Sequence, residues 1–401
     1  MNHSGLPESK HGTTPSFRSQ LGPLLFLAAI FFMNFIGRII IAPLMPNIEE
    51  ELHISHGQAG TLFLLISLGY FPSLMGSGFV SSRLTHRKTI FLSSIIVGLA
   101  LLGVSQCRSL WSIQAGLIIL GLSAGIYVPS GIATLTSLVS SRHWGKALAI
   151  HELAPNLSFL AAPLVSETLL TWFSWRGILG VLGALALLLG FAFERFGKGG
   201  QFYGEAPSLG SLKILTADRG FWIMLVLFSL GVSGTLGVYA MLPLFLVVER
   251  GLGRSSANTL IAISRIPGPV VSMMAGWATD RFGAKLTLFG VLFFCGLATM
   301  LLGTMEGPWL VMAVILQPIL AVCFFPAAFS ALSMTVSPAV QNVAVSLTAP
   351  FAFLIGGGVV PILVGMAGDA GCFDLGLVLV GGFIFLGAVF SRFLTLQDQS
   401  R

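Results

Sequence analysis

The stretch "LIAISRIPGPVVSMMAGWATDRFGAKL", residues 260–286, decides the fold of this chain. It begins as an apolar run of helical length and ends in a short glycine-containing loop that carries Asp280 and Lys285. Arg265 stands in the middle of the apolar run, where a charge costs about 2.5–3.5 kcal/mol even on the translocon insertion scale. We therefore expect a membrane helix that keeps one buried charge for a function.

The composition indicates that a membrane is present. Of the 401 residues, 55% are hydrophobic and 9% are charged, whereas soluble domains carry about 25% charged residues. So few charged residues are not enough for the surface of a soluble protein of this size. The chain is therefore predicted to be an all-α membrane protein. Twelve apolar segments are each near or above the roughly 20 residues needed to cross the hydrocarbon layer: 21–46, 57–82, 89–106, 109–139, 145–171, 176–194, 220–248, 255–279, 284–305, 307–335, 340–366 and 373–395.

The net charge of +6 reflects topology and does not indicate a nucleic-acid partner. Of the 21 lysines and arginines, 15 fall in the tails and loops of one side, four fall in the loops of the other side, and Arg38 and Arg265 fall inside apolar segments. Basic residues accumulate in cytoplasmic loops. Both termini are therefore predicted to be cytoplasmic, in a multi-pass protein of the plasma membrane.

The chain divides into two halves that repeat each other at an offset near 200 residues. "GFVSSRLTHRK" from Gly78 is echoed by "GWATDRFGAK" from Gly276, and "YVPSGIATLTSLVS" from Tyr127 is echoed by "FFPAAFSALSMTVS" from Phe324. Parallel six-helix repeats are typical of transporters that alternate access to a site between the halves. The predicted domains are a cytoplasmic tail at 1–20, a six-helix bundle at 21–194, a cytoplasmic loop at 195–219, a second six-helix bundle at 220–395 and a cytoplasmic tail at 396–401.

These motifs resemble those of the major facilitator superfamily of secondary transporters over essentially the whole chain. The loop motif G-x-x-x-D-R-x-G-x-[RK] is complete in the second half and degraded in the first, where Ser82 stands in place of the aspartate. The resemblance implies two pseudo-symmetric six-helix bundles, and a loop aspartate that holds helix ends together in one access state through a charge-assisted hydrogen bond. We expect Asp280 to carry this role alone; the alternative is that the basic loop residues only set topology. The predicted gating residues are Gly78, Arg83, Arg87, Gly276, Asp280, Arg281, Gly283 and Lys285.

The two arginines inside apolar segments are the first candidates for substrate binding. Arg38 precedes Pro46 in a pattern similar to that of the organophosphate antiporters, and Arg265 resembles an arginine of the monocarboxylate transporters, although each resemblance is partial. A guanidinium binds carboxylate or phosphate through two parallel hydrogen bonds. We therefore predict that both arginines bind a small anion at the centre of the molecule. The alternative is an internal pair with Glu152, or bonding to carbonyl groups beside Pro267.

The fifth apolar segment supplies further candidates. Asn156 lies near its middle and is predicted either to bind substrate or to act as a packing polar group. His151 and Glu152 lie nearer the cytoplasmic side, and ionisable residues inside a membrane segment are candidates for proton relay. The alternative for this pair is that both side chains line the cytoplasmic vestibule. Tyr127 and Tyr239 complete the predicted substrate-binding set.

We therefore predict a non-enzymatic, twelve-helix secondary transporter that moves a small organic anion by proton symport or anion exchange. No cofactor or metal is expected, because no phosphate-cradling loop stands beside a lysine and the four cysteines lack metal-ligand spacing. The expected partners are the small-molecule substrate, the lipid bilayer and a proton or counter-anion, with the protein as a monomer. Rival interpretations are an exporter of drugs or amphiphiles by proton antiport, and a non-transporting sensor of the same fold.

Overall fold

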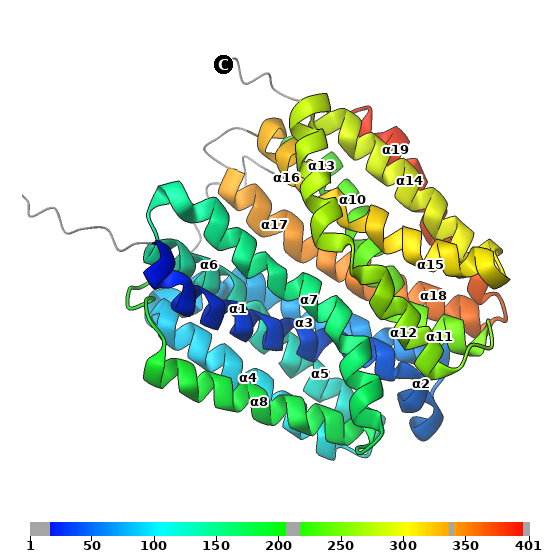
Figure 1. Ribbon diagram of the computed structural model, residues 1–401, viewed down its shortest axis with the longest axis horizontal. Helices are drawn as coiled ribbons and strands as arrows, with labels where there is room; N and C mark the ends of the chain where they lie inside the picture. Colours follow the sequence, from blue (N-terminus) through cyan, green and yellow to red (C-terminus); the bar gives the residue numbers. More distant parts are fainter. Residues whose placement is uncertain (1–16, 206–216, 337–340, 396–401) are drawn as a thin grey trace, which may run out of the picture.

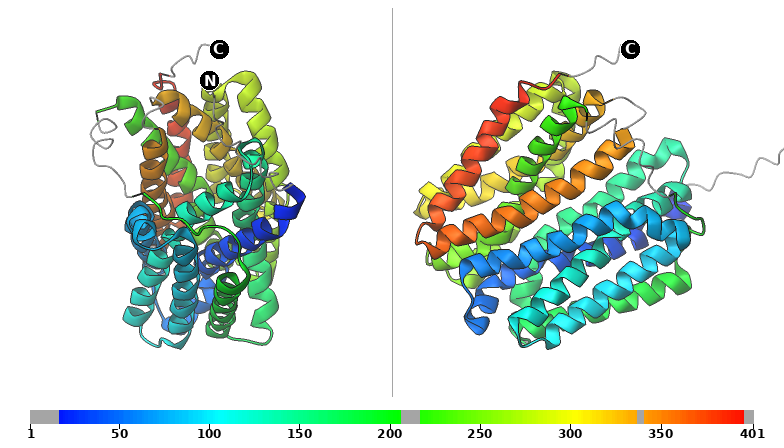
Figure 2. Two further views of the ribbon diagram at one scale, coloured as in Figure 1. Left: turned by 90° about the vertical axis from the view of Figure 1, so that its left-hand side faces the viewer. Right: turned by 180° about the vertical axis from the view of Figure 1, so that it is seen from behind.

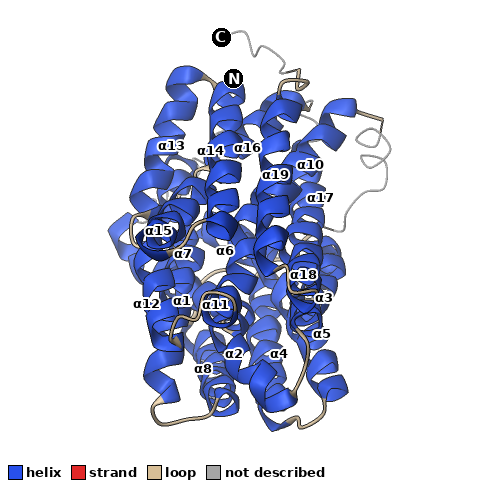
Figure 3. Cartoon of the chain, turned by 90° about the vertical axis from the view of Figure 1, so that its right-hand side faces the viewer, coloured by secondary structure: helices blue, strands red, loops and turns tan. Residues whose placement is uncertain are grey.

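The computed structural model describes residues 17–205, 217–336 and 341–395. Over these ranges the regular secondary structure is helical, with no strand (Figure 3). Within these ranges, twelve helical segments are long and apolar enough to cross a membrane, which confirms the predicted fold class. Residues 1–16 of the predicted first tail, 206–216 of the predicted central loop and the predicted last tail at 396–401 lie outside the described residues.

The first half of the chain forms a bundle of antiparallel helices, drawn from blue to green in Figures 1 and 2. Each long helix is predominantly apolar, and short polar turns connect the helices. The helices are α1 (Phe17–Ile39), α2 (Ile41–Leu52), α3 (His56–Arg83), α4 (His86–Gln106), α5 (Leu110–Gly125), α6 (Tyr127–Leu138), α7 (Trp144–Leu170) and α8 (Trp175–Phe196). The first span thus ends at Leu52, six residues beyond the end of the predicted apolar segment.

The second half forms a similar bundle, drawn from green to red in Figures 1 and 2. Its seventh and eleventh spans each contain a short π-helical segment, η2 (Ser233–Gly237) and η4 (Ile355–Val359). The helices are α10 (Arg219–Val232), α11 (Val238–Val248), α12 (Arg254–Arg265), α13 (Gly268–Phe282), α14 (Ala284–Thr304), α15 (Gly307–Val322), α16 (Phe324–Thr335), α17 (Gln341–Leu354), α18 (Val360–Asp369) and α19 (Phe373–Ser391).

Four of the spans are interrupted between two consecutive helices, and proline explains where. A proline lacks the N–H that would bond to the carbonyl four residues earlier, and its ring clashes with that carbonyl. Each interruption falls three residues before a proline. The pairs are Ile40 with Pro43, Ile126 with Pro129, Ile266 with Pro269, and Cys323 with Pro326. Helices interrupted at mid-membrane are typical of the substrate-binding region of transporters.

The two halves pack closely through α3 and α18 because glycines let their backbones approach. A Cβ on Gly60 would lie 2.4 Å from the carbonyl oxygen of Pro361, and a Cβ on Gly365 would lie 2.2 Å from that of His56. Small residues at such contacts are typical of helix packing in membranes. This contact lies toward the end of the molecule opposite to the start of α1, which we call the far end.

Polar bonds between the halves cluster at the far end. Asp369, the last residue of α18, accepts hydrogen bonds from Ser55 Oγ at 2.7 Å and from the amides of His56 at 2.7 Å and Gly57 at 3.0 Å. It thereby caps the first turn of α3, and a negative charge is favourable at a helix N-terminus. Figure 1 shows the start of α7 well apart from α13 at the other end of the molecule.

A second cross-half contact mirrors the first. Glu167, near the end of α7, accepts hydrogen bonds from Asn258 Nδ2 at 2.7 Å and Arg254 Nε at 3.1 Å, both at the start of α12. Since α7 and α18 occupy corresponding places in the two repeats, as do α12 and α3, each half uses a carboxylate to bind the helix start of the other. The far end is therefore closed by a matched pair of contacts.

Candidate functional site

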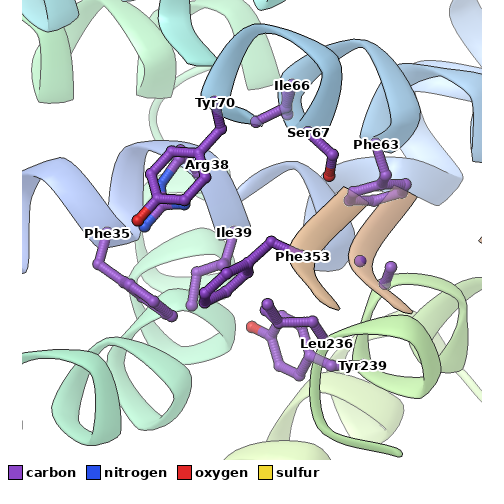
Figure 4. Close-up of a pocket in the computed structure, with 12 residues that line it drawn as sticks. Phe35, Arg38, Ile39, Phe63, Ile66, Ser67, Tyr70, Leu236, Tyr239 and Phe353 are labelled. Atoms are coloured by element: carbon purple, nitrogen blue, oxygen red, sulfur yellow. The ribbon is translucent and has the colours of Figure 1, made fainter. Parts of the chain in front are cut away.

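A small central cavity lies between the halves, lined by α1, α3, the η2–α11 region and the α17–η4 region (Figure 4). Its volume is about 40 Å³, enough for a few water molecules. Most of its lining is aliphatic or aromatic. The polar lining residues are Arg38, Ser67, Tyr70 and Tyr239.

Arg38, the penultimate residue of α1, is buried with 7% of its surface exposed. Its guanidinium carbon lies 4.3 Å from the ring centre of Tyr70 and 4.9 Å from that of Phe35. Figure 4 shows the Tyr70 ring lying against the guanidinium. Such cation–π contacts contribute about 0.5–2 kcal/mol. The buried Nε of Arg38 has no hydrogen-bond partner, so its hydrogen-bonding capacity is incompletely used.

Arg265, the last residue of α12, has similar surroundings in the other half. Its guanidinium carbon lies 4.5 Å from the ring centre of Phe159 and 5.1 Å from that of Tyr239. Its buried Nε also lacks a partner. Within the described ranges neither Arg265 nor Arg38 forms an ion pair with a carboxylate, so the internal pairing with Glu152 that we considered as an alternative is not found.

A chain of aromatic rings joins the two arginines across the interface. Phe35 and Phe159 meet edge to face at 5.3 Å, and Phe159 meets Tyr239 of the other half at 4.8 Å. The Tyr239 hydroxyl is buried without a hydrogen-bond partner. Three polar groups with unused bonding capacity thus gather around one aromatic cluster at the interface between the halves.

The π-helical segments η2 and η4 contact each other beside the cavity. A Cβ on Gly237 would lie 2.5 Å from the Gly356 carbonyl oxygen. Gln317, buried on α15, donates from Nε2 to the Gly234 carbonyl at 2.7 Å and to Thr299 Oγ1 at 3.2 Å. Single-turn π segments are frequent at functional sites, and here they set the position of the helix that carries Tyr239.

Sequence reasoning did not identify Phe35, Tyr70, Phe159 or Gln317. Phenylalanine is too frequent in this chain, at 32 residues, for one position to stand out. Tyr70 did carry a signal, because the chain has only four tyrosines and three of them lie in apolar segments. The partners of these side chains lie on other helices, which periodicity within one segment does not reveal.

His151 and Glu152 occupy a separate place on α7. The His151 ring is fully buried and stacks on Phe31 at 4.3 Å, whereas the Glu152 side chain is 60% exposed. Nδ1 of His151 lies 3.4 Å from Glu152 Oε1, and Nε2 lies 3.2 Å from the hydroxyl of Tyr127. That hydroxyl donates to the Leu27 carbonyl oxygen at 2.8 Å. The buried imidazole is therefore linked to the surface by one exposed carboxylate.

Two predicted substrate ligands, Tyr127 and Asn156, lie outside the lining of the central cavity. Tyr127 is fully buried, and its hydroxyl binds Leu27 and His151, so the structure does not place it in the central cavity. Asn156 is half-buried outside the cavity lining, and its amide donates to the Glu152 carbonyl oxygen one turn earlier at 2.9 Å. The position of a residue along one helix does not show toward which neighbouring helix its side chain points.

The predicted gating residues fall into two groups. Arg87 donates to the carbonyl oxygens of Gly197, Phe193 and Glu194 at 2.5, 3.1 and 2.6 Å, which closes the C-terminus of α8. Lys285 likewise donates to the Leu394 carbonyl oxygen at 2.6 Å. Asp280 is exposed and, among the residues described, has no ion pair or hydrogen bond to a side chain.

The other gating residues make fewer contacts. Arg83 and Arg281 are exposed, the latter with its guanidinium 5.6 Å from the Trp277 ring. Gly283 has φ +87°, which suits glycine at the end of α13. Gly78 and Gly276 are partly exposed. The latch expected of Asp280 is therefore not formed in the arrangement whose far end is closed, and its gating role remains a prediction.

Comparison with protein families and with known proteins identifies the family to which this architecture belongs. Residues 27–361 match the model of the Major Facilitator Superfamily. A probable sulfoacetate transporter of Cupriavidus necator is 23% identical over 398 residues, which cover 92% of each chain. A probable L-galactonate transporter of Escherichia coli is 22% identical over 64% of this chain and 60% of that protein. A TsgA homologue of Buchnera aphidicola is 26% identical over 40% of this chain, which spans only 44% of the length of that relative.

Solved structures share the fold at low sequence identity. A bacterial homologue of the human lysosomal transporter Spinster, in an inward-facing and unoccupied conformation, has a TM-score of 0.80 at 16% identity and covers 94% of this chain and 97% of that chain. The fucose:proton symporter of Escherichia coli has a TM-score of 0.65, also at 16% identity, and covers 95% of this chain and all of that chain. At such identities these likenesses show the fold alone.

Proposed function

The chain belongs to the Major Facilitator Superfamily and is a membrane transporter, not an enzyme, and on that premise we propose that it moves a small organic anion. Arg38 and Arg265 bind the anion between the halves, in a plasma membrane with the start of α1 on the cytoplasmic side. The names of two relatives, probable transporters of sulfoacetate and L-galactonate, support an organic acid as substrate.

The observation that carries this proposal is that the guanidiniums of Arg38 and Arg265, at the interface between the halves, have no carboxylate partner among the residues that the structure describes. A buried charge without a counter-charge is costly, and the retained charge is best explained by a ligand that supplies the counter-charge. Rings lie over each guanidinium, and the Nε without a partner is on the edge through which a guanidinium forms parallel hydrogen bonds to a carboxylate. Because Arg38 and Arg265 belong to different halves, one anion can draw the halves together.

The test is anion counterflow in proteoliposomes with Arg265→Lys and Arg265→Ala. Lysine keeps the charge but loses the planar fork, so we expect reduced transport, and alanine should abolish transport in protein that still inserts and folds. Arg195→Ala is the matched control, because Arg195 also lies 5.4 Å from a phenylalanine ring but on the exposed end of α8. Near-normal counterflow by Arg265→Ala would refute the role of this arginine.

For coupling we propose proton symport through His151 and Glu152. A carbonyl oxygen cannot donate, so the 2.8 Å contact between Tyr127 and Leu27 uses the single hydroxyl proton. Nε2 of His151 must then donate to the Tyr127 oxygen, which leaves Nδ1 facing Glu152. A neutral imidazole and an ionised carboxylate would set two lone pairs against each other there. One additional proton between Nδ1 of His151 and the Glu152 carboxylate turns this repulsive contact into a hydrogen bond, so the pair is suited to bind a single proton.

The exposure of Glu152 supports access of protons to this pair from the end of the molecule at which α1 begins. Glu152 is largely exposed in the first third of α7, while His151 is buried. Among the contacts described, the titratable side chains within hydrogen-bond distance of His151 are Tyr127 of α6 and Glu152 itself. We expect Glu152→Gln to abolish proton-driven accumulation while substrate-for-substrate exchange continues. Unchanged accumulation against a gradient would leave anion exchange as the transport mode, and loss of both activities would indicate a structural role.

A further inference from the structure

The hydrogen-bonding character of the central site narrows the class of anion further, and this step rests on the proposed function. The groups with unused bonding capacity are Nε of Arg38, Nε of Arg265 and the hydroxyl of Tyr239. The first two are donors only. Among the twelve residues that line the cavity there is no carboxylate, carboxamide or imidazole. The site is therefore rich in donors and positive charge, and poor in acceptors.

A poor supply of acceptors disfavours hydroxylated substrates. Each hydroxyl of a sugar acid brings a donor that needs an acceptor, and a buried donor without one costs about 1–3 kcal/mol. Only the hydroxyl oxygens of Ser67, Tyr70 and Tyr239 are available among the lining side chains. A ligand whose polar atoms are all acceptors, such as a carboxylate or sulfonate on an apolar spacer, avoids this cost.

The charge of the site favours two acidic groups over one. A monoanion can neutralise one guanidinium and leaves the other without a counter-charge, whereas a dianion neutralises both. The ring contacts that connect Arg38 through Phe35 and Phe159 to Arg265 measure 4.9, 5.3 and 4.5 Å, so the two guanidinium carbons lie less than 15 Å apart. This value is an upper limit, so with N–H···O bonds of about 2.8 Å at each end a ligand that bonds to both guanidiniums needs only a short spacer.

We propose that the substrate is a compact aliphatic dianion with an acidic group at each end. One group enters the cavity of about 40 Å³ beside Arg38 and Tyr239. The other reaches Arg265 past the ring of Phe159, which is only partly buried. The cavity takes a carboxylate-sized end group but not a whole sugar acid, and the ring pair between Phe159 and Tyr239 separates the two ends of the ligand.

The experiment compares four anions as competitors of counterflow and as ligands in a thermal-shift assay at pH 7.5. Succinate is an aliphatic dianion, butyrate a monoanion of the same carbon number, tartrate a dianion with two added hydroxyls, and gluconate a polyhydroxylated monoanion. We expect succinate to act at a concentration at least tenfold below that of butyrate, with tartrate weaker than succinate and gluconate inactive. In Arg265→Gln and in Arg38→Gln the preference for succinate over butyrate, measured by thermal shift because counterflow is expected to be lost, should fall toward one.

The outcomes separate the two proposals. Equal action of butyrate and succinate, or the strongest action by gluconate, overturns the dianion assignment and leaves organic-anion transport intact. Binding of lipophilic cations, with no effect of any of the four anions, overturns both. A preference for succinate that persists unchanged in both glutamine variants would also overturn the assignment, because the second charge would then be recognised elsewhere.

Discussion

The contact of Asp369 with the start of α3 predicts how strongly one side chain holds the far end closed. Asp369→Asn keeps the oxygen that accepts from the His56 amide and replaces the oxygen that accepts from Ser55 Oγ and the Gly57 amide. The new NH₂ group then faces the N–H of Gly57, so two of the three hydrogen bonds across the halves are lost or reorganised.

Hydrogen bonds to a charged group contribute about 1.5–3 kcal/mol each, and a negative charge at a helix N-terminus adds about 0.3–1 kcal/mol. Because the Ser55 contact is exposed to solvent, we take the low end and expect the closed far end to lose about 2 kcal/mol relative to the open one. That corresponds to roughly a 30-fold change in the equilibrium between the two arrangements.

The assay is pulsed electron–electron double resonance, which measures the distance between two spin labels. The labels are attached at Ser109→Cys and Trp309→Cys in a cysteine-free background. Both positions are exposed and belong to different halves, and they lie at the far end, Ser109 in the connection between α4 and α5 and Trp309 in the first turn of α15. We expect Asp369→Asn to raise the population of the longer distance. The matched control is Asp374→Asn, since Asp374 bonds only to the neighbouring amide of Leu375 among the contacts described. An unchanged distribution, or the same change in the control, would refute the latch.

Two further predictions follow from packing and topology. Gly60→Ala should lower the melting temperature and open the far end, because its Cβ would lie 2.4 Å from the Pro361 carbonyl oxygen. Gly76→Ala on the same helix is the control: its Cβ would have nothing within 4 Å, so this variant should be neutral or stabilising. Equal melting temperatures of the two variants would contradict the prediction. A cysteine at Glu50 should react with an impermeant thiol reagent added outside cells and one at Lys198 should not, and the reverse pattern would refute the proposed orientation.

Much of the fold could be predicted from local sequence. The twelve apolar segments specify twelve spans because an apolar run of that length is stable only within the bilayer or a protein core. The family was likewise evident from the complete loop motif around Asp280 and from the repeats, and the family match at residues 27–361 confirms it. The interruptions at Ile40, Ile126 and Cys323 were readable in principle, since each precedes a proline by three residues.

The sequence also determined that Arg38 and Arg265 stand deep in their spans, because depth follows from position along one helix. It did not determine their surroundings. Whether a mid-helix side chain faces lipid, a neighbouring helix or the interface between the halves depends on how the helix is rotated, and that is set by contacts with residues hundreds of positions away. For this reason the sequence did not show that Tyr127 and Asn156 lie outside the lining of the central cavity.

Only the tertiary structure decided that Phe159 of one half meets Tyr239 of the other, and that both cover Arg265. It also decided that Asp369 caps a helix more than 300 residues earlier in the chain. Hydrophobicity along a segment is a property of that segment, so the sequence alone determines which parts enter the membrane. Cross-half contacts depend on which glycines allow backbones to approach and on which polar groups then come within bonding distance, and these are properties of the assembled pair of bundles.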